Sequence, residues 1–439
     1  MITIDIENSF STITGLSIQQ HNELKKELSY DMNGSSKYMQ SQFGHRTVSL
    51  LTKKGKFPTG LLYYAVLLLK KSSVKYNTID HRIKPEPFKG LYKLSLPVIP
   101  YPEQDRAVEV ALHHHRGIIS APTGSGKSVI MAILVNKLQL KTLIVVPTLE
   151  LKNQLRTSFK SWFGETSNIV IENIGATCLE TMSNFDCLII DEAHHVAAKT
   201  YRDLNKGAWK GIYYRFYFTA TPFRSRDEER LLFESVAGRV IYSLSYRQAV
   251  EKGFIVPVEG YFYEIERTKV SGNLNSWFSV YNELVVKNHN RNALIASLLS
   301  HLKGNSVSTL CLVKEIEHGQ ILSEMSKVHF ANGKDKDSTD LIKFFSEGKL
   351  KALIGTNGIV GEGVDTRAAE YIIIAGLGKS KNQFMQQIGR GVRVYPGKDS
   401  CKIITFLDKS HKWTRDHFST QVKILREEYG CEIIKLDDT

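Results

Sequence analysis

The stretch with the clearest chemical potential is SAPTGSGKSV, residues 120–129. Two glycines, a lysine and several hydroxyl side chains stand between the apolar runs GII and IMAIL, which predict a strand and a helix. Glycine costs backbone entropy at such a place, so a geometric need must explain it. Backbone N–H groups at the start of a helix bind phosphate oxygens well. The stretch therefore predicts a phosphate-binding loop.

Each residue of this loop has an expected role. Lys127 is placed to reach β- and γ-phosphate oxygens, and the hydroxyl of Ser128 to hold Mg²⁺. Ala121 stands where the strictest form of the pattern has glycine, and it still allows a tight turn. The backbone that cradles the phosphates is expected from Thr123, Gly124, Ser125 and Gly126.

Two adjacent carboxylates follow another apolar run, in CLIIDEAHH. Asp191 and Glu192 end a predicted buried strand, and ligands of open α/β sheets bind at that strand end. Read alone, the acidic pair could cap a helix N-terminus. Together with the loop, Asp191 is expected to bind the Mg²⁺ water shell and Glu192 to orient and deprotonate the attacking water.

The segments APTGSGKS, DEAH, FTATP and QQIGRGVR, in this order, resemble the motor motifs of superfamily 2 helicases and translocases. The resemblance covers about residues 99–408 and implies two RecA-like domains with ATP in the cleft between them. Within the superfamily, the chain is similar to compact UvsW-type phage enzymes, which act on branched DNA and carry a small α/β module before the motor.

Further nucleotide contacts follow from this resemblance. Gln104 is similar to the family's adenine-reading glutamine, and Gly363 and Asp365 to a nucleotide-facing loop of the second domain. Arg390 and Arg393 match the family's arginine fingers, with Gln386 alongside. QQIGRGVR also predicts the two arginines one helical turn apart, with both guanidinium groups facing the γ-phosphate.

A motor must also hold a strand, and the family does so through sugar–phosphate contacts without reading bases. The matching positions are Pro147, Thr148, Thr177, Lys314 and Thr356. A Thr or Lys after a strand is often a helix cap or a solvated side chain, so that reading stays open. Lys53, Lys54 and Lys56 fit either a basic hairpin turn that contacts duplex phosphates or a solvated turn.

Two other clusters have simpler explanations. Trp277, Phe278 and Tyr281 could stack on bases, although aromatic clusters are more often core. The three residues His113–His115 point about 100° apart on a helix and cannot converge on one metal ion.

These residues need elements to position them. Short apolar runs alternate with amphipathic segments from about residue 101, which predicts two tandem parallel α/β domains. Residues 1–95 instead predict a small α+β module with fourteen Lys and Arg against seven Asp and Glu, an excess of +7. We therefore expect a basic DNA-binding domain (1–95), RecA-like domain 1 (96–250) and RecA-like domain 2 (251–439).

Composition limits the remaining possibilities. The 439 residues carry a net charge of +13, which favours a polyanionic partner. Five scattered cysteines without a CxxC pair argue against a zinc ribbon and a disulfide framework, and no run is long and apolar enough for a membrane span. A cytoplasmic monomer is expected, in the host cytoplasm if the chain is of phage origin, with no membrane association and no obligate protein partner.

The function that these features favour is an ATP- and Mg²⁺-dependent DNA helicase that remodels forked or four-way DNA in replication, recombination or repair. Three alternatives stay open. They are an RNA helicase, a nucleic-acid binding and annealing protein whose ATPase switches its grip, and the motor part of a restriction-like complex.

Overall fold

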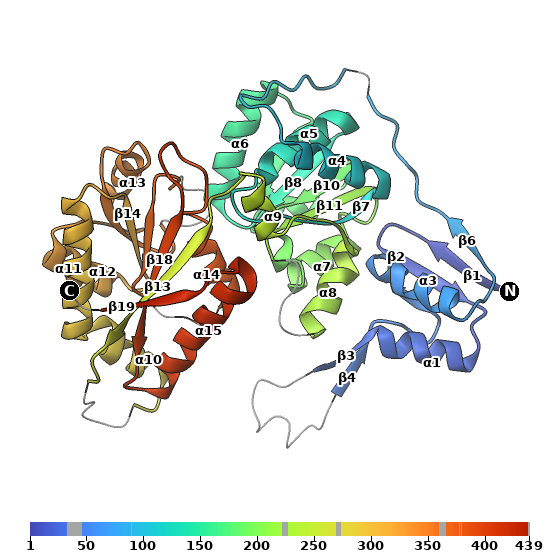
Figure 1. The fold of residues 1–439 in the computed structure, drawn as a ribbon. Helices are drawn as coiled ribbons and strands as arrows, with labels where there is room; N and C mark the ends of the chain where they lie inside the picture. Colours follow the sequence, from blue (N-terminus) through green and yellow to red (C-terminus); the bar gives the residue numbers. More distant parts are fainter. Residues whose placement is uncertain are drawn as a thin grey trace. The chain divides into compact units, whose positions relative to one another are not determined.

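The computed structural model describes residues 1–32, 46–88, 90–221, 227–268, 274–359, 366–376, 378 and 380–437. The chain forms two compact units (Figure 1). The first comprises Met1–Ala121 and Gly126–Ser243, and the second comprises Pro122–Ser125 and Leu244–Thr439. None of the helices in the described ranges is long and apolar enough to cross a membrane.

The N-terminal module is built on a mixed four-stranded sheet in the order β5-β2-β1-β6. Ile2, Ile4 and Ile6 of β1 alternate inward, so one face of the sheet is core. Ser17 and Gln20 form a capping box that starts the first helix. The strands and helices are β1 (Ile2–Ile6), β2 (Phe10–Thr14), α1 (Ile18–Glu27), β5 (Lys56–Pro58), η1 (Thr59–Leu61), α3 (Leu62–Lys71) and β6 (Tyr76–Asp80).

A second, two-stranded sheet and a basic turn complete this module. β3 (Ser29–Met32) pairs with β4 (Arg46–Ser49) in antiparallel register. Lys53 and Lys54 are exposed on a tight turn, which hydrogen bonds between Thr52 and Lys56 close. The strands on either side of this turn belong to different sheets, so the turn is not the tip of a hairpin.

The module shares a hydrophobic core with the motor part of the first unit. Leu231 of α8 (Asp227–Ala237) packs in the same cluster as the apolar residues of β1, α1 and α3. Tyr64 donates a hydrogen bond to Glu234 at 2.6 Å, and a Cβ added at Gly60 would overlap the Glu234 and Ser235 carbonyl oxygens. The module is therefore not packed as an independent body.

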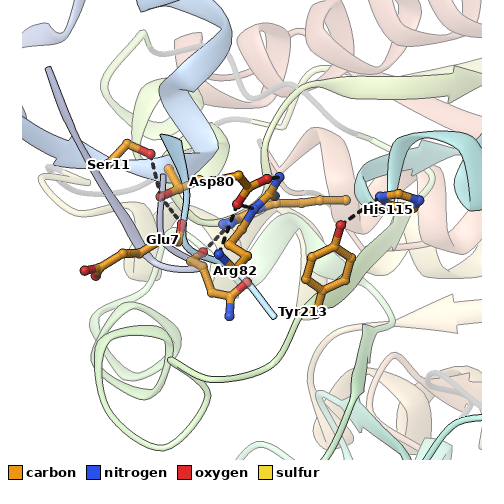
Figure 2. A network of polar contacts seen from close by, with 9 residues as sticks. Glu7, Ser11, Asp80, Arg82, His115 and Tyr213 are labelled. Carbon is orange, nitrogen blue, oxygen red and sulfur yellow. Dashed lines mark hydrogen bonds and ion pairs between the residues drawn. The ribbon is translucent and has the colours of Figure 1, made fainter. Parts of the chain in front are cut away.

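Arginine side chains reinforce this junction. Arg215 is fully buried and donates to the Asn205 amide oxygen, to Ser9 and to main-chain carbonyls. Arg116 donates to the Asn8 carbonyl at 2.5 Å. Figure 2 shows Arg82, held by Asp80, beside Tyr213, whose hydroxyl meets His115 at 3.1 Å. Guanidinium groups thus donate hydrogen bonds to main-chain carbonyls of both the module and the motor part.

The motor part of the first unit is a six-stranded parallel sheet in the order β12-β7-β11-β10-β8-β9. Its middle strands are buried on both faces and read as continuous apolar runs, as parallel sheets do. The strands are β7 (Arg116–Ser120), β8 (Thr142–Val146), β9 (Ile169–Asn173), β10 (Cys187–Ile190), β11 (Tyr214–Thr219) and β12 (Val240–Ser243).

Helices cover both faces of this sheet (Figure 1). The apolar residues of α4, α5 and α6 form one core cluster with the sheet, and those of α7 and α8 form another on the opposite face. The helices are α4 (Pro102–His114), α5 (Lys127–Leu138), α6 (Leu149–Phe163) and α7 (Lys199–Lys206), besides α8.

The second unit repeats this architecture with a seven-stranded parallel sheet in the order β15-β16-β14-β17-β18-β13-β19. The strands are β13 (Val258–Ile265), β14 (Thr309–Val313), β15 (His329–Ala331), β16 (Ala352–Thr356), β17 (Tyr371–Ile374), β18 (Cys401–Asp408) and β19 (Ile433–Leu436). The helices are α9 (Tyr246–Glu251), α10 (Trp277–Tyr281), α11 (His289–Gly304), α12 (Ile316–Ser326), α13 (Ser338–Ser346), α14 (Lys381–Ile388) and α15 (Lys412–Tyr429). The predicted fold class, two parallel α/β domains after a small α+β module, is confirmed.

Candidate functional site

The predicted phosphate-binding loop joins the carboxyl end of β7 to the start of α5. Gly124 and Gly126 have φ of 90° and 79°, a region that favours glycine. α5 begins at Lys127, so its first backbone N–H groups are available for an anion. Both glycines are therefore needed for the shape of the loop.

Gln104 lies beside this loop rather than on the protein surface. The side chain is 4% exposed, accepts a hydrogen bond from the Tyr101 N–H at 2.9 Å and donates to the Gly126 carbonyl at 3.4 Å. A Cβ at Gly126 would overlap its Nε2 atom. Gln104 thus links the first turn of α4 to the loop.

Asp191 and Glu192 follow β10 directly, at the same sheet edge as the loop. Asp191 is 8% exposed and accepts a hydrogen bond from the Glu192 N–H at 2.9 Å. The Lys127 Nζ lies 3.9 Å from the Glu192 Oε1 and 3.4 Å from the Ala121 carbonyl oxygen. The structure therefore brings Lys127 and the acidic pair together, as the sequence predicted for one site.

Glu192 has a second partner on its other side. The His194 Nδ1 lies 3.3 Å from the Glu192 Oε2 and 3.5 Å from the Thr219 hydroxyl, at the end of β11. The Thr219 hydroxyl in turn accepts from the Thr221 N–H at 3.1 Å. We call Lys127, Glu192, His194, Thr219 and Thr221 the contact chain. It connects the phosphate loop with the TAT segment after β11.

The electrostatics of the two carboxylates differ. Burial and the neighbouring Glu192 carboxylate raise the pKa of Asp191. Burial alone would raise the pKa of Glu192 as well, but Lys127 and His194 outweigh it and hold that pKa below its usual range. Glu192 is thus kept ionised, while Asp191 carries a charge that a further cation would stabilise.

His194 and Thr219 were absent from the predicted site residues. Both belong to motifs that the sequence displays, DEAHH and FTATP. The usable signal was the position of His194 two residues after Glu192. Spacing along the chain did not reveal that β10 and β11 are adjacent strands, which brings the two side chains together.

One predicted geometry in the second unit is wrong. α14 ends at Ile388, so Arg390 lies in the turn after the helix and Arg393 in an extended segment bridged to Ile255. The two arginines are therefore not one helical turn apart. The glycines at positions 389 and 391 end the helix, because glycine has low helix propensity. Gln386, by contrast, does lie on α14.

In the motor part of the first unit, the predicted nucleic-acid contacts lie at the carboxyl edge of the sheet. Pro147 and Thr148 follow β8, and Thr177 begins the short helix η2 (Thr177–Glu180) after β9. Thr148 caps α6, because its side chain accepts from the Leu151 N–H at 3.3 Å. Thr177 is exposed. Thr148 is thus a helix cap, which is one of the two interpretations that the sequence left open.

The second unit places Lys314 and Thr356 after neighbouring strands. Lys314 follows β14 with about half of its side chain exposed, 3.5 Å from the Glu315 carboxylate. Thr356 ends β16 and is only 8% exposed. Gly363 and Asp365 lie outside the described residues, as does Pro222, the last residue of the TATP segment.

A phosphate loop, a carboxylate pair and a parallel sheet define the class of P-loop nucleotide hydrolases. Residues 98–182 and 177–224 match the family model of the type III restriction enzyme res subunit, and residues 290–395 match the helicase conserved C-terminal domain. The chain belongs to the superfamily 2 helicases.

Several curated proteins are similar to this chain. A putative helicase of Sulfolobus islandicus filamentous virus is 26% identical over 64% of this chain, which spans 58% of that protein. The DNA 3'-5' translocase XPB2 of Sulfurisphaera tokodaii is 25% identical, over 77% of this chain and 89% of its own. The ATP-dependent DNA helicase uvsW of phage T4 is 22% identical, over 73% and 70% respectively.

Among solved structures, a fragment of a putative HsdR subunit of a type I restriction enzyme from Vibrio vulnificus has a similar fold. It has a TM-score of 0.60 at 19% identity and covers 90% of this chain and 76% of its own. This likeness concerns the fold.

Proposed function

We propose that the chain is an ATP-dependent DNA helicase or translocase that remodels forked and four-way DNA. The observation that carries the motor assignment is the contact chain, which links the loop lysine through Glu192 and His194 to the TAT segment. Such a chain can transmit the state of a bound γ-phosphate to the end of β11, because each member contacts the next.

The residues of the first unit divide the work on ATP. Lys127 leaves Glu192 to bind the β- and γ-phosphates, and the freed Glu192 carboxylate orients and deprotonates the attacking water. His194 then holds the other oxygen of Glu192 in place. The carboxylate is ionised at neutral pH, as a general base requires.

The donor set fits a magnesium ion. Asp191 supplies a buried carboxylate whose raised pKa signals a need for positive charge, and Ser128 at the start of α5 supplies a hydroxyl. Mg²⁺ would neutralise charge on the β- and γ-phosphates. Asp191 and Ser128 are therefore the residues we propose to hold it, with Thr123, Gly124, Ser125 and Gly126 around the phosphates.

Further contacts are proposed from the second unit and from α4. Arg390 and Arg393 would supply positive charge to the γ-phosphate during transfer, with Gln386, Gly363 and Asp365 as further contacts. Gln104 would read the adenine, because its amide offers a donor and an acceptor beside the loop. ATP binding would then compete for the amide that now contacts the Gly126 carbonyl.

DNA is the proposed track because two of the relatives are named as acting on DNA. Pro147, Thr148, Thr177, Lys314 and Thr356 would contact one strand. Lys53, Lys54 and Lys56 would contact a duplex arm through phosphates. Since the module shares a core with the first motor domain, it would hold that arm at a fixed orientation to this domain. Preference for branched DNA would arise because the protein binds the single strand and the duplex arm at the same time.

The experiment that tests this function measures ATPase stimulation by single-stranded, duplex, forked and four-way DNA, and by RNA of the same sequences. Forked or four-way DNA should stimulate best. Equal stimulation by all DNA forms would contradict the branch role, and stronger stimulation by RNA would support an RNA helicase. Junction binding without strand displacement would instead support the annealing protein, and a nuclease that co-purifies would support the restriction-like motor.

A further inference from the structure

Phe278 lies apart from the aromatic cluster that the sequence places around it. Tyr281 is 3% exposed, and the Trp277 ring packs on His417 with ring centroids 4.0 Å apart. Phe278 in contrast is 77% exposed. The cluster thus divides into a buried anchor and one aromatic ring held out toward solvent.

This ring borders a cavity of about 280 Å³, which Tyr281, Val286 and Ile316 also line. α10 continues directly into η4 (Asn282–Val286), a π-helical turn. Such turns are rare and are frequent at functional sites. The cavity therefore has a fixed frame, because Val286 is buried in a hydrophobic cluster with Tyr281 and Trp277 packs against that cluster.

Charged groups of both signs surround the cavity, and Lys334 is part of its lining. The Lys314 Nζ lies 5.1 Å from the centre of the Tyr281 ring and 3.5 Å from the Glu315 carboxylate. Lys287 lies 4.0 Å from the Glu317 carboxylate, and both acids line the cavity. Ammonium groups at the rim can bind phosphates, and the partly exposed carboxylates can accept from the amino groups of bases.

We propose that this cavity receives one unpaired base of the strand whose backbone contacts Lys314, stacked on Phe278. The inference rests on the proposed function, since it needs a nucleic-acid track at the end of β14. An aromatic ring beside a phosphate-binding lysine is the arrangement that holds single strands without sequence preference, because every base has a π-face. A duplex keeps its bases stacked inside, so the site selects separated strands.

The first test compares Phe278→Ala and Phe278→Trp in the full chain. The probe is single-stranded DNA that contains 2-aminopurine, whose fluorescence falls when the base stacks. Loss of one stacking contact should weaken single-strand affinity about 5- to 150-fold, the equivalent of ~1–3 kcal/mol, and reduce the quenching. Phe278→Trp should retain both. The matched control is Phe344→Ala, because Phe344 is 45% exposed on α13 of the same unit and away from the cavity lining.

The second test separates base from phosphate. An oligonucleotide with abasic positions keeps the phosphates, so it should bind the original protein as weakly as normal DNA binds Phe278→Ala, and the two losses should not add. Unchanged affinity of Phe278→Ala for normal DNA, or fully additive losses, would overturn the base site and leave the motor assignment intact. A protein that no nucleic acid binds or stimulates would instead refute the proposed function.

Discussion

At the scale of single residues, the backbone at Glu192 is the feature that most needs a functional reason. Glu192 has a φ of 47°, a backbone conformation that residues other than glycine rarely adopt. The strained backbone places its carboxylate between Lys127 and His194. Strain of this kind persists where the surroundings enforce it, which is common at active sites.

This arrangement predicts that nucleotide binding and hydrolysis can be separated. Lys127→Ala should weaken ATP binding, because the phosphates lose their lysine. Glu192→Gln should still bind ATP, but its turnover should fall about 10²- to 10⁴-fold, because the amide cannot take a proton from water. Fluorescent-nucleotide titration and phosphate release measure the two effects.

Glu150→Gln is a suitable control, since Glu150 is an exposed acid in the first turn of α6. It should leave both measurements unchanged. Turnover in Glu192→Gln equal to that of the original protein would rule out Glu192 as the base.

Arg390 supports a second prediction at this scale. If this residue stabilises charge on the transferred phosphoryl group, Arg390→Ala should lower turnover about 10³- to 10⁵-fold with a much smaller loss of nucleotide affinity. Arg247→Ala is the matched control, because Arg247 is exposed on α9 in the same unit. A variant that loses affinity and keeps turnover would place Arg390 outside the reaction.

At the scale of elements, the contact between η1 and α8 decides whether the N-terminal module can move. Gly60→Ala should destabilise the first unit by about 1–3 kcal/mol, because the added methyl group meets two main-chain oxygens that cannot move aside easily. Urea unfolding measures the loss. Gly211→Ala, in the same unit, has nothing within 4 Å of the new Cβ and should cost much less.

Equal stability of these two variants would contradict the close packing of the module. The same packing predicts that removal of residues 1–95 exposes Leu231 and leaves Arg215 without the Ser9 hydroxyl. Substitutions on the surface of the module are thus a cleaner test of DNA binding than truncation.

The turn with Lys53 and Lys54 offers such a surface. All three lysines of this turn are exposed, and Lys56 also lies 4.8 Å from the centre of the Phe10 ring, so the test changes Lys53 and Lys54 alone. The double variant Lys53→Ala/Lys54→Ala should reduce the slope of log K against log salt on duplex DNA by about 1.8, at ~0.9 per phosphate contact. Lys160→Ala on α6 serves as a control and should leave the slope unchanged. An unchanged slope in the double variant would show that this turn makes no phosphate contacts.

At the scale of the whole molecule, His318 links stability to pH. Burial and the Arg291 guanidinium lower the pKa of His318 to about 3, whereas an unfolded histidine titrates near ~6.5. Because the folded state resists protonation, this contribution to stability is complete above pH ~6.5 and decreases as the pH falls toward 3.

The free energy of unfolding should therefore drop by about 2 kcal/mol between pH 7.5 and 5.0 through His318 alone. His318→Gln should show a correspondingly smaller drop, although its stability at pH 7.5 is lower because the histidine is packed. His329→Gln, at an exposed position in the same unit, should keep the full drop. Urea unfolding followed by tryptophan fluorescence at both pH values measures this, and equal drops in all three proteins would contradict it.

The sequence by itself determined the motor motifs and most strands that carry them. GIIS, LIVV and CLIID are short apolar runs, and such runs are typical of strands that are buried on both faces. Gly124 and Gly126 indicate a loop whose backbone has positive φ, which the structure has at both positions. The apolar runs do not extend to the edge strands β9, β12, β15 and β19, or to β13 beside β19, because polar residues interrupt these strands or the strands are short.

Only the tertiary structure decided which of these pieces meet. Strand order brings His194 to Thr219, and side-chain packing buries Tyr281 and part of Trp277 but leaves Phe278 exposed. The helix predicted through Arg390 ends at Ile388, and the module that looked separate shares a core with α8. These outcomes depend on contacts between residues far apart in the chain. A local pattern of residue types cannot predict the free energies of such contacts.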